Sequence, residues 1–265
     1  MSTTVFIGGG RIASALIAGL RRAKHKGALV VHDRNPEKLR ALQRYFKVEA
    51  EPDLQSAVAR ADMLIVAVRP ASFGETLDSI ALGVCASQPL VVGVAAGIPL
   101  KKLRFHLGSR VRCARALPSP ICRIGRGLTA VTFSRDVRAP DRKQVYEFFE
   151  QVGPVLEMAE GRFDAFNAAY SPGHGYHALA TLAKAAQDAG LDRKMALTAA
   201  AHALADAILY WRGSGESLSK LLQEAATPGG TTAATLAAMD AAGYTRVIER
   251  GLAAGIRQAQ ANARH

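Results

Sequence analysis

The sequence predicts an α/β protein whose first part is a doubly wound, mainly parallel sheet and whose second part is all helical. Residues 1–159 alternate short apolar runs with stretches of helical period, which is the rhythm of βαβ units. The early apolar runs are continuous rather than alternating, as in parallel strands that are buried on both faces. After about residue 160 the chain is rich in Ala and Leu and poor in β-branched runs. We therefore expect two domains, residues 1–159 and 160–265.

Seven strands are expected in the first domain. Arg11–Arg22 and Pro36–Tyr45 have the apolar spacing of helices and lie between the first three of these strands. The expected strands are Thr3–Ile7, Leu29–His32, Met63–Ala67, Leu90–Val94, Val111–Ala114, Leu128–Phe133 and Pro154–Met158.

The second domain is expected to consist of apolar helices. Apolar residues recur at helical spacing across Leu197–Ile208, and another helical stretch covers Thr245–Ala259. Two glycine-bearing breaks, Ser171–Gly175 and Thr227–Thr231, interrupt the helices. Helices this apolar must bury their apolar faces in a protein interior or interface, and a domain of about a hundred residues builds only a small core of its own. A partner subunit is one explanation, and internal packing is the other.

Composition argues against several classes of protein. With 49% hydrophobic and 21% charged residues, the 265-residue chain can build a packed core. Its longest apolar runs, such as Met63–Val68, are strand-sized, so no membrane span is expected. The N-terminus enters a strand at once, which argues against a secretory signal. Cys85, Cys113 and Cys122 lack CxxC spacing, so we expect no disulfide, no metal site and a cytoplasmic location.

The excess of positive charge lies almost wholly in the first domain. The formal net charge is +12, of which residues 1–159 carry +11 and residues 160–265 carry +1. One interpretation is an arginine-rich solvated surface, and the other is a field that attracts an anionic ligand such as a phosphorylated cofactor. Nucleic acid is not expected as a partner, because the sequence has neither a basic run nor an aromatic-interleaved basic patch.

A glycine-rich turn follows the first expected strand. Gly8–Ala13 reads G-x-G-x-x-A and opens a helix, as in Rossmann-type dinucleotide-binding folds. Gly8 allows the tight turn, Gly10 lets the backbone approach a pyrophosphate, and Ala13 permits close packing of the helix on the strand. Free N–H groups and the dipole at the helix N-terminus favour the anion. A purely structural glycine turn is the alternative. The candidate pyrophosphate-binding residues are Gly8, Gly10, Arg11, Ile12 and Ala13.

The end of the second strand carries both residue types that distinguish the nicotinamide cofactors. An acidic residue here, such as Asp33, binds the ribose 2′-hydroxyl of NAD, whereas an arginine, such as Arg34, accommodates the 2′-phosphate of NADP. Lys38 adds positive charge one helical turn further, so we expect NADP, with NADPH preferred and NAD as the alternative. Asn35 belongs to the same candidate group. Asp33 could instead cap the helix that Pro36 begins.

Two more loops follow the third and fourth expected strands. Ligands of doubly wound sheets bind beyond the carboxyl ends of the strands, near the switch point of the topology. Both loops are therefore placed to touch a dinucleotide, although ordinary βα loops remain the alternative. The candidates are Ala67, Val68, Arg69, Pro70, Ala96 and Gly97.

In this order, the motifs resemble those of pyrroline-5-carboxylate reductase, a family of proline-forming enzymes. The Pro-Gly-Gly-Thr-Thr segment is much more specific than the glycine-rich turn, and the matches span almost the full chain. The matching segments are Phe6–Gly10, Arg34–Leu39, Ala67–Pro70, Ala95–Ile98, Gly127–Ala130 and Pro228–Thr232.

The resemblance implies a Rossmann domain, a helical dimerisation and substrate domain, and hydride transfer from NAD(P)H to a cyclic imine. It also implies a homodimer or a higher homo-oligomer formed through the helical domain. In the family, the threonine that matches Thr232 lies by the ring nitrogen of the substrate. Thr232 could also cap the helix Thr231–Met239. The residues implied to bind the cyclic imine carboxylate are Gly173, Gly175, Thr227, Gly229, Gly230 and Thr231.

Three departures from the family pattern fall at the expected substrate site. Leu117–Ile121 stands where the family has Met-Pro-Asn-Thr-Pro, so Ser119 replaces an Asn that lies near the nicotinamide. Ala169–Tyr176 stands roughly where the family has Ser-Gly-Ser-Gly-Pro-Ala, and Glu224 lies near a place that is usually amide-bearing. The cofactor motifs are unchanged, which suggests retained cofactor use and altered substrate recognition.

Among the candidates, His174 is the residue that departs most clearly from the family pattern. It lies in the first glycine-bearing break, and histidine titrates near neutral pH, so it can act as a general acid or base. Tyr170 and Tyr176 are alternative proton donors, and a structural or exposed role is the alternative for His174. The candidate catalytic residues are Thr232, His174 and Ser119.

We therefore expect an NADPH-dependent reductase that converts 1-pyrroline-5-carboxylate to L-proline. Reduction of a different cyclic imine is the first alternative, and a non-catalytic NADP-binding paralogue is the second. No Ser/His/Asp arrangement and no His/Cys/Asp cluster has convincing spacing, so neither nucleophilic catalysis nor a metal is expected.

Overall fold

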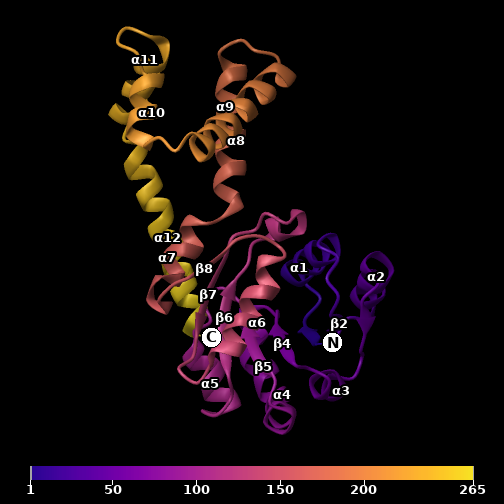
Figure 1. Ribbon diagram of the computed structural model, residues 1–265. Coiled ribbons are helices and arrows are strands. Elements are labelled where there is room, and N and C mark those ends of the chain that lie inside the picture. The colour runs from indigo at the N-terminus through magenta and orange to yellow at the C-terminus, as the bar shows by residue number, and fades with distance from the viewer. Residues whose placement is uncertain (1, 265) are drawn as a thin grey trace. The chain divides into compact units, whose positions relative to one another are not determined.

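The computed structural model describes residues 2–264, which form two compact units (Figure 1). Unit 1 holds the described residues up to Tyr170 and those from Ala254 onward, and unit 2 is Ser171–Ala253. The domain boundary expected after residue 159 stays a prediction.

Unit 1 is built on one eight-stranded sheet with the order β3-β2-β1-β4-β5-β6-β7-β8. All neighbouring strands are parallel except β6 and β7, which are antiparallel. This architecture confirms the predicted fold class. The strands are β1 (Thr3–Ile7), β2 (Ala28–His32), β3 (Glu49–Ala50), β4 (Met63–Val66), β5 (Leu90–Gly93), β6 (Cys113–Leu117), β7 (Thr129–Phe133) and β8 (Val155–Glu157).

Helices cover both faces of the sheet. Alternate strand residues such as Val5 and Phe6 face opposite sides, and both are fully buried because each side carries its own apolar cluster. One cluster includes residues of α1 (Arg11–Arg22), α2 (Pro36–Phe46) and α6 (Ala139–Glu150). The other includes residues of α3 (Leu54–Ala59), α4 (Phe73–Ser87) and α5 (Leu100–Leu107). The remaining segments of unit 1 are η1 (Pro70–Ser72), η2 (Pro120–Ile124), η3 (Glu160–Arg162), α7 (Phe163–Ala169) and the end of α12 (Tyr244–Arg264).

The strand expected at Val111–Ala114 is wrong in its bounds, because β6 begins at Cys113 and continues to Leu117. The charged Arg115 interrupts the apolar run, but it lies inside the strand with its side chain only 4% exposed. Its guanidinium lies 3.4 Å from Glu160 Oε1 and 4.6 Å from the ring centre of Phe163. Burial lowers the pKa of Arg115, and the neighbouring carboxylates oppose that shift. The sequence analysis did not predict β3, because two residues are too few to show an apolar strand pattern.

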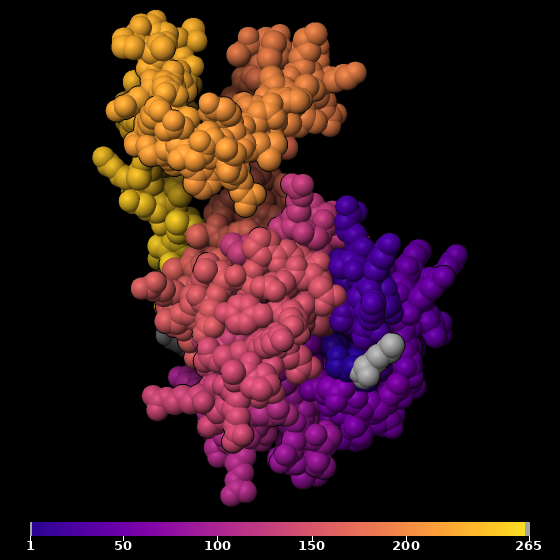
Figure 2. Space-filling view, in the orientation of Figure 1, coloured from indigo at the N-terminus to yellow at the C-terminus, as the bar shows by residue number. Residues whose placement is uncertain are grey.

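Unit 2 consists of helices that bury little of their own surface. The helices are α8 (Pro172–Asp188), α9 (Arg193–Ser214), α10 (Leu218–Ala225), α11 (Thr231–Ala241) and the first part of α12 (Tyr244–Arg264). Among the residues of this unit, the buried ones are Ala183, Ala196 and Ala200. Large apolar side chains, including Leu209 and Trp211, are exposed. Within unit 2, Figure 2 shows one lobe that contains α8 and α9 and another that contains α10 and α11.

Exposed apolar surface on this scale marks an interaction face, because a monomeric protein rarely leaves such a surface in water. Between residues 2 and 264, no helix has both the length and the apolar character required to cross a membrane. The same part of the chain contains no cluster of three or more residues able to bind a metal ion.

The break between helices that the sequence led us to expect at Ser171–Gly175 is shorter and lies earlier, at Tyr170 and Ser171. Pro172 begins α8, and the Oγ of Ser171 accepts the N–H of Gly173 at 3.2 Å. His174 therefore lies in the first helical turn. Proline at the first position fixes a helical φ, and a serine cap offsets the low helix propensity of the two glycines.

Candidate active site

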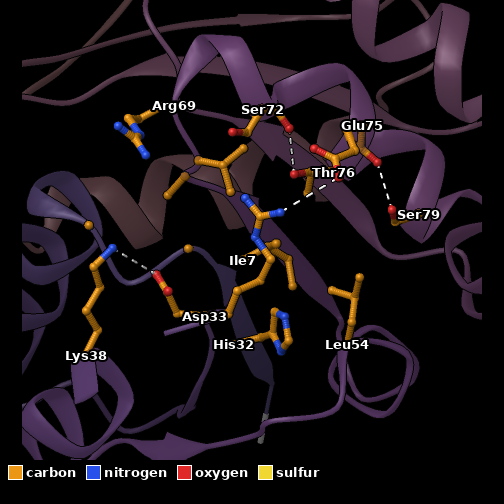
Figure 3. A pocket seen from close by; sticks show the side chains of 15 residues that line it. Ile7, His32, Asp33, Lys38, Leu54, Arg69, Ser72, Glu75, Thr76 and Ser79 are labelled. Carbon is orange, nitrogen blue, oxygen red and sulfur yellow. Dashed lines mark hydrogen bonds and ion pairs between the residues drawn. The ribbon is translucent and has the colours of Figure 1, made fainter. Parts of the chain in front are cut away.

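A cavity of about 210 Å³ lies at the carboxyl ends of β1, β2 and β4 (Figure 3). Its lining contains eight of the residues predicted to bind the cofactor. These are Gly8, Gly10, Asp33, Arg34, Lys38, Ala67, Val68 and Arg69. The other candidates, Arg11, Ile12, Ala13, Asn35, Pro70, Ala96 and Gly97, do not line it. The cavity thus joins three loops that are far apart in the sequence.

The glycine-rich turn has the shape that a pyrophosphate requires. Gly8 has a φ of +100°, and a Cβ there would come within 2.9 Å of the carbonyl oxygen of Ala67. At Gly10 a Cβ would meet nothing within 4 Å, so the space beside the backbone is open. The first intrahelical bond of α1 is donated by Ser14 to Gly10, and no side chain caps the helix. The N–H groups of Arg11, Ile12 and Ala13 are therefore available to an anion, and the turn fits a dinucleotide phosphate.

The Asp33 carboxylate ties the loops of the cavity together. Its Oδ2 accepts the N–H of Gly9 at 2.8 Å, and its Oδ1 accepts the N–H of Asn35 at 2.8 Å. Asn35 rather than Asp33 caps α2, because its Oδ1 accepts the N–H of Glu37 at 2.8 Å and that of Lys38 at 3.3 Å. The capping role considered for Asp33 is therefore wrong, and its side chain is only 12% exposed.

Two cations stand at the rim of the cavity. The side chains of Arg34 and Lys38 are 76% and 52% exposed, so both are free to turn toward a bound anion. Lys38 Nζ lies 3.7 Å from Asp33 Oδ2, and Arg34 Nη1 lies 3.8 Å from Oε1 of Glu75 on α4. Pairs this exposed are weak, and a doubly charged phosphate competes well with a single carboxylate.

The sequence analysis missed the wall that α4 contributes. Glu75, Thr76 and Ser79 line the cavity from one face of this helix, and His32 and Leu54 line it from other segments. The Thr76 hydroxyl donates to the Ser72 carbonyl at 2.7 Å. The sequence did offer a signal for this wall. Ser79 lies three and four positions after Thr76 and Glu75, and residues at these spacings share one face of a helix.

Gly97 faces the protein rather than the cavity. A Cβ at Gly97 would overlap the carbonyl oxygen of Ala259 and come within 2.9 Å of Asn262 Cβ. The end of α12, which belongs to unit 1, therefore packs directly on the loop after β5. This close approach accounts for a glycine at this position without a cofactor.

Ser119 follows the carboxyl end of β6 and is 4% exposed. Its Oγ accepts the N–H of Ile121 at 3.1 Å and so caps η2, and a serine hydroxyl can donate as well as accept. The neighbouring β7 begins beside it, because Leu117 on β6 pairs with Ala130 on β7. Ser119 thus lies at the edge of the sheet where ligands bind in α/β folds.

The other catalytic and substrate candidates lie in unit 2, at the starts of two helices. Gly173, His174 and Gly175 are in the first turn of α8, and His174 is exposed. Gly230 caps α11, so Thr232 lies in the helix and is not its cap, unlike the alternative considered above. The residues around this second start are Thr227, Gly229, Gly230, Thr231 and Thr232.

The start of α11 leaves N–H groups without helical partners. Its first intrahelical bond is donated by Ala234 to the carbonyl of Gly230 at 3.2 Å. No side chain caps this helix, and its first turn contains no acidic residue. A carboxylate would therefore meet unpaired N–H donors and a favourable helix dipole here.

Comparison with known proteins gives matches along the whole chain. The family model described as "NADP oxidoreductase coenzyme F420-dependent" matches residues 3–97, and that described as "Pyrroline-5-carboxylate reductase dimerisation" matches residues 160–262. Pyrroline-5-carboxylate reductase of Mycobacterium leprae is 31% identical over 287 residues, covering 98% of this chain and 97% of that protein.

Two solved structures share the fold. That of 1-pyrroline-5-carboxylate reductase from Streptococcus pyogenes has a TM-score of 0.90 at 23% identity and covers 98% of both chains. The Plasmodium falciparum pyrroline carboxylate reductase with NADP bound has a TM-score of 0.89 at 21% identity, covering 99% of this chain and 98% of that one. With the identity and coverage of the sequence match, they lead to one conclusion: the chain belongs to the pyrroline-5-carboxylate reductase family.

Proposed function

We propose that this protein reduces 1-pyrroline-5-carboxylate to L-proline with NADPH. The observation that carries the proposal is the cavity at the carboxyl ends of β1, β2 and β4, with its open glycine turn and two rim cations. It occurs in a chain that matches family members over nearly its whole length.

The cofactor, when bound, supplies the hydride. The open N–H groups at the start of α1 would hold its pyrophosphate. Arg34 and Lys38 would hold the 2′-phosphate, which favours NADPH over NADH. Asp33 lines the same cavity, so NADH remains a usable second cofactor.

The substrate would be held chiefly by residues of unit 2. The unpaired N–H groups at the start of α11, at Thr231 and Thr232, suit its carboxylate. The Thr232 hydroxyl can accept a hydrogen bond from the protonated ring nitrogen. Protonation makes the C=N carbon electrophilic, so addition of a hydride leaves a neutral amine. His174 would supply or keep that proton, and Ser119 would orient the reacting groups.

The exposed apolar helices support assembly of the chain with itself. The residues matched by the dimerisation model carry many of the exposed large apolar side chains, including Leu209 and Trp211. We propose a homodimer or higher homo-oligomer that covers them. We propose a cytoplasmic enzyme without a nucleic-acid partner, in keeping with three free cysteines and with the match to family members over nearly the whole chain.

The direct test is product analysis. The purified protein is incubated with NADPH and either 1-pyrroline-5-carboxylate or a six-membered cyclic imine carboxylate, and the amino acids formed are identified. L-Proline as the main product supports the proposal. Product from the six-membered imine alone would favour the first alternative, since Ser119 and Ala169–Tyr176 depart from the family pattern. NADPH binding without any product would favour a non-catalytic paralogue.

A further inference from the structure

Glu75 brings a negative charge into the cavity that we assign to the cofactor. It lies in the first turn of α4 and lines the cavity from that helix. Figure 3 shows Asp33 and Lys38 on one side of the cavity and Glu75 on the other. The cavity therefore contains two carboxylates beside the cations that are expected to bind the 2′-phosphate.

The partner of the Glu75 carboxylate is the arginine that we assign to the 2′-phosphate. Arg34 Nη1 lies 3.8 Å from Glu75 Oε1, and within residues 2–264 neither side chain makes another ion pair or a hydrogen bond. Asp33, the other carboxylate of the cavity, is already bonded to the backbone N–H groups of Gly9 and Asn35. A phosphate held by Arg34 therefore comes close to the Glu75 carboxylate, which has no other cation beside it.

The contact between Glu75 and Arg34 is too loose to orient the guanidinium. At 3.8 Å it is an ion pair without a hydrogen bond, and the two side chains are 72% and 76% exposed. Long side chains in such a pair are not held in one geometry, and their mutual attraction is weak. Glu75 therefore contributes charge rather than position. It attracts Arg34 in the cofactor-free protein, and it repels a phosphate that binds to Arg34.

We propose that Glu75 is a specificity-determining residue that weakens the preference of this protein for NADPH over NADH. The inference rests on the proposed function, in which Arg34 and Lys38 hold the 2′-phosphate. A phosphate monoester carries nearly two negative charges at neutral pH, so it is repelled by Glu75 and competes with it for Arg34. NADH has a neutral hydroxyl at the same position, which meets neither penalty.

The test removes the charge of Glu75 and keeps the shape of its side chain. Calorimetric titration with NADP⁺ and with NAD⁺ compares Glu75→Gln with the unmodified protein in the absence of turnover. The Kd for NADP⁺ should fall about three- to tenfold, as for removal of one exposed like charge beside a phosphate. The Kd for NAD⁺ should stay unchanged. In steady-state kinetics, the KM for NADPH should fall by a similar factor and the KM for NADH should not.

Glu37→Gln is the matched control. Glu37 is an exposed glutamate in the first turn of α2, the helix that follows Arg34, and it lies outside the cavity. The same loss of charge at this position should leave both Kd values nearly unchanged, because solvent and salt screen a carboxylate outside the cavity. Salt gives a second readout. The tightening caused by Glu75→Gln should shrink between about 0.05 and 0.5 M sodium chloride, since the charges involved are exposed.

Three results would overturn the inference. An unchanged Kd for NADP⁺ in Glu75→Gln would mean that Glu75 does not sense the 2′-phosphate, and an equal tightening of both dinucleotides would mean that it acts on a part that they share. Weaker binding of NADP⁺ would mean that Glu75 positions Arg34 for the phosphate. Failure of the proposed function looks different, because the unmodified protein would then bind neither dinucleotide or would form no product from the imine.

Discussion

The Asp33 carboxylate accepts the backbone N–H of Gly9 with 2.8 Å between Oδ2 and the nitrogen, and so joins the end of β2 to the glycine-rich turn after β1. Asp33→Ala removes this bond and frees the turn that would hold the pyrophosphate. Because both nicotinamide cofactors contain a pyrophosphate, steady-state kinetics should show the KM values for NADPH and NADH rising together, by about tenfold.

Asp62→Ala is the matched control for this variant. The Asp62 carboxylate accepts the N–H of Thr3 at 2.7 Å at the other end of β1, away from the cavity. It should leave both cofactor KM values unchanged. A rise in the NADH value alone for Asp33→Ala would instead mean that Asp33 serves the ribose hydroxyl and not the turn.

The second prediction concerns the 2′-phosphate. Arg34→Ala should raise the KM for NADPH about 10- to 100-fold and leave that for NADH nearly unchanged, because one charge-assisted contact to a phosphate is lost. Arg44→Ala is a suitable control, since Arg44 is an exposed arginine of α2, the helix that follows Arg34, and lies outside the cavity. Equal effects of Arg34→Ala on the two cofactors would contradict the assignment.

A third prediction separates packing from cofactor binding at Gly97. Gly97→Ala places a Cβ against the Ala259 carbonyl and should lower the free energy of unfolding by about 1–3 kcal/mol. Thermal unfolding measures this loss. The extra stabilisation by NADPH should match that of the unmodified protein.

Gly108→Ala is the control for backbone strain at Gly97. Gly108 has a φ of +91°, but a Cβ there meets nothing within 4 Å. Gly108→Ala should therefore lower the free energy of unfolding by less than Gly97→Ala does. A loss of NADPH stabilisation in Gly97→Ala alone would show that this loop contacts the cofactor.

The cysteines give a fourth prediction. Burial raises the pKa of the Cys113 thiol to about 12 and raises that of Cys122, whereas Cys85 is exposed. Since the thiolate is the reactive form, a thiol reagent at mildly alkaline pH should label Cys85 rapidly and the other two only after unfolding. Rapid labelling of all three in the native protein would contradict the packing of β6 and η2.

Much of unit 1 could be predicted because its sequence signals are local. The turn around Gly8 and Gly10 needs residue types that few other structures require, and the helix Arg11–Arg22 follows from its apolar spacing. The end of β6 was missed because the burial of Arg115 depends on Glu160 and Asp164, which are 45 or more residues away. Contacts between distant segments leave no periodic signal in either one.

In the candidate site, too, residues with a local sequence signal could be predicted and residues that depend on distant contacts could not. Arg34 and Lys38 could be named from their place after a strand, and both line the cavity. Glu75 could not, because its significance comes from a partner on another element, Arg34 at the cavity rim. In unit 2 the helices were recognised, but the start of α8 was misplaced because Gly173 and Gly175 resemble a break.

The most direct test of the account is the rate of NADPH oxidation with 1-pyrroline-5-carboxylate, followed by the absorbance of the reduced nicotinamide, with NADH in parallel. The account predicts rapid oxidation that is faster with NADPH than with NADH at low cofactor concentration, since Arg34 and Lys38 stand at the rim of the cavity. No oxidation of either cofactor, in a protein that binds NADPH by fluorescence, would contradict it.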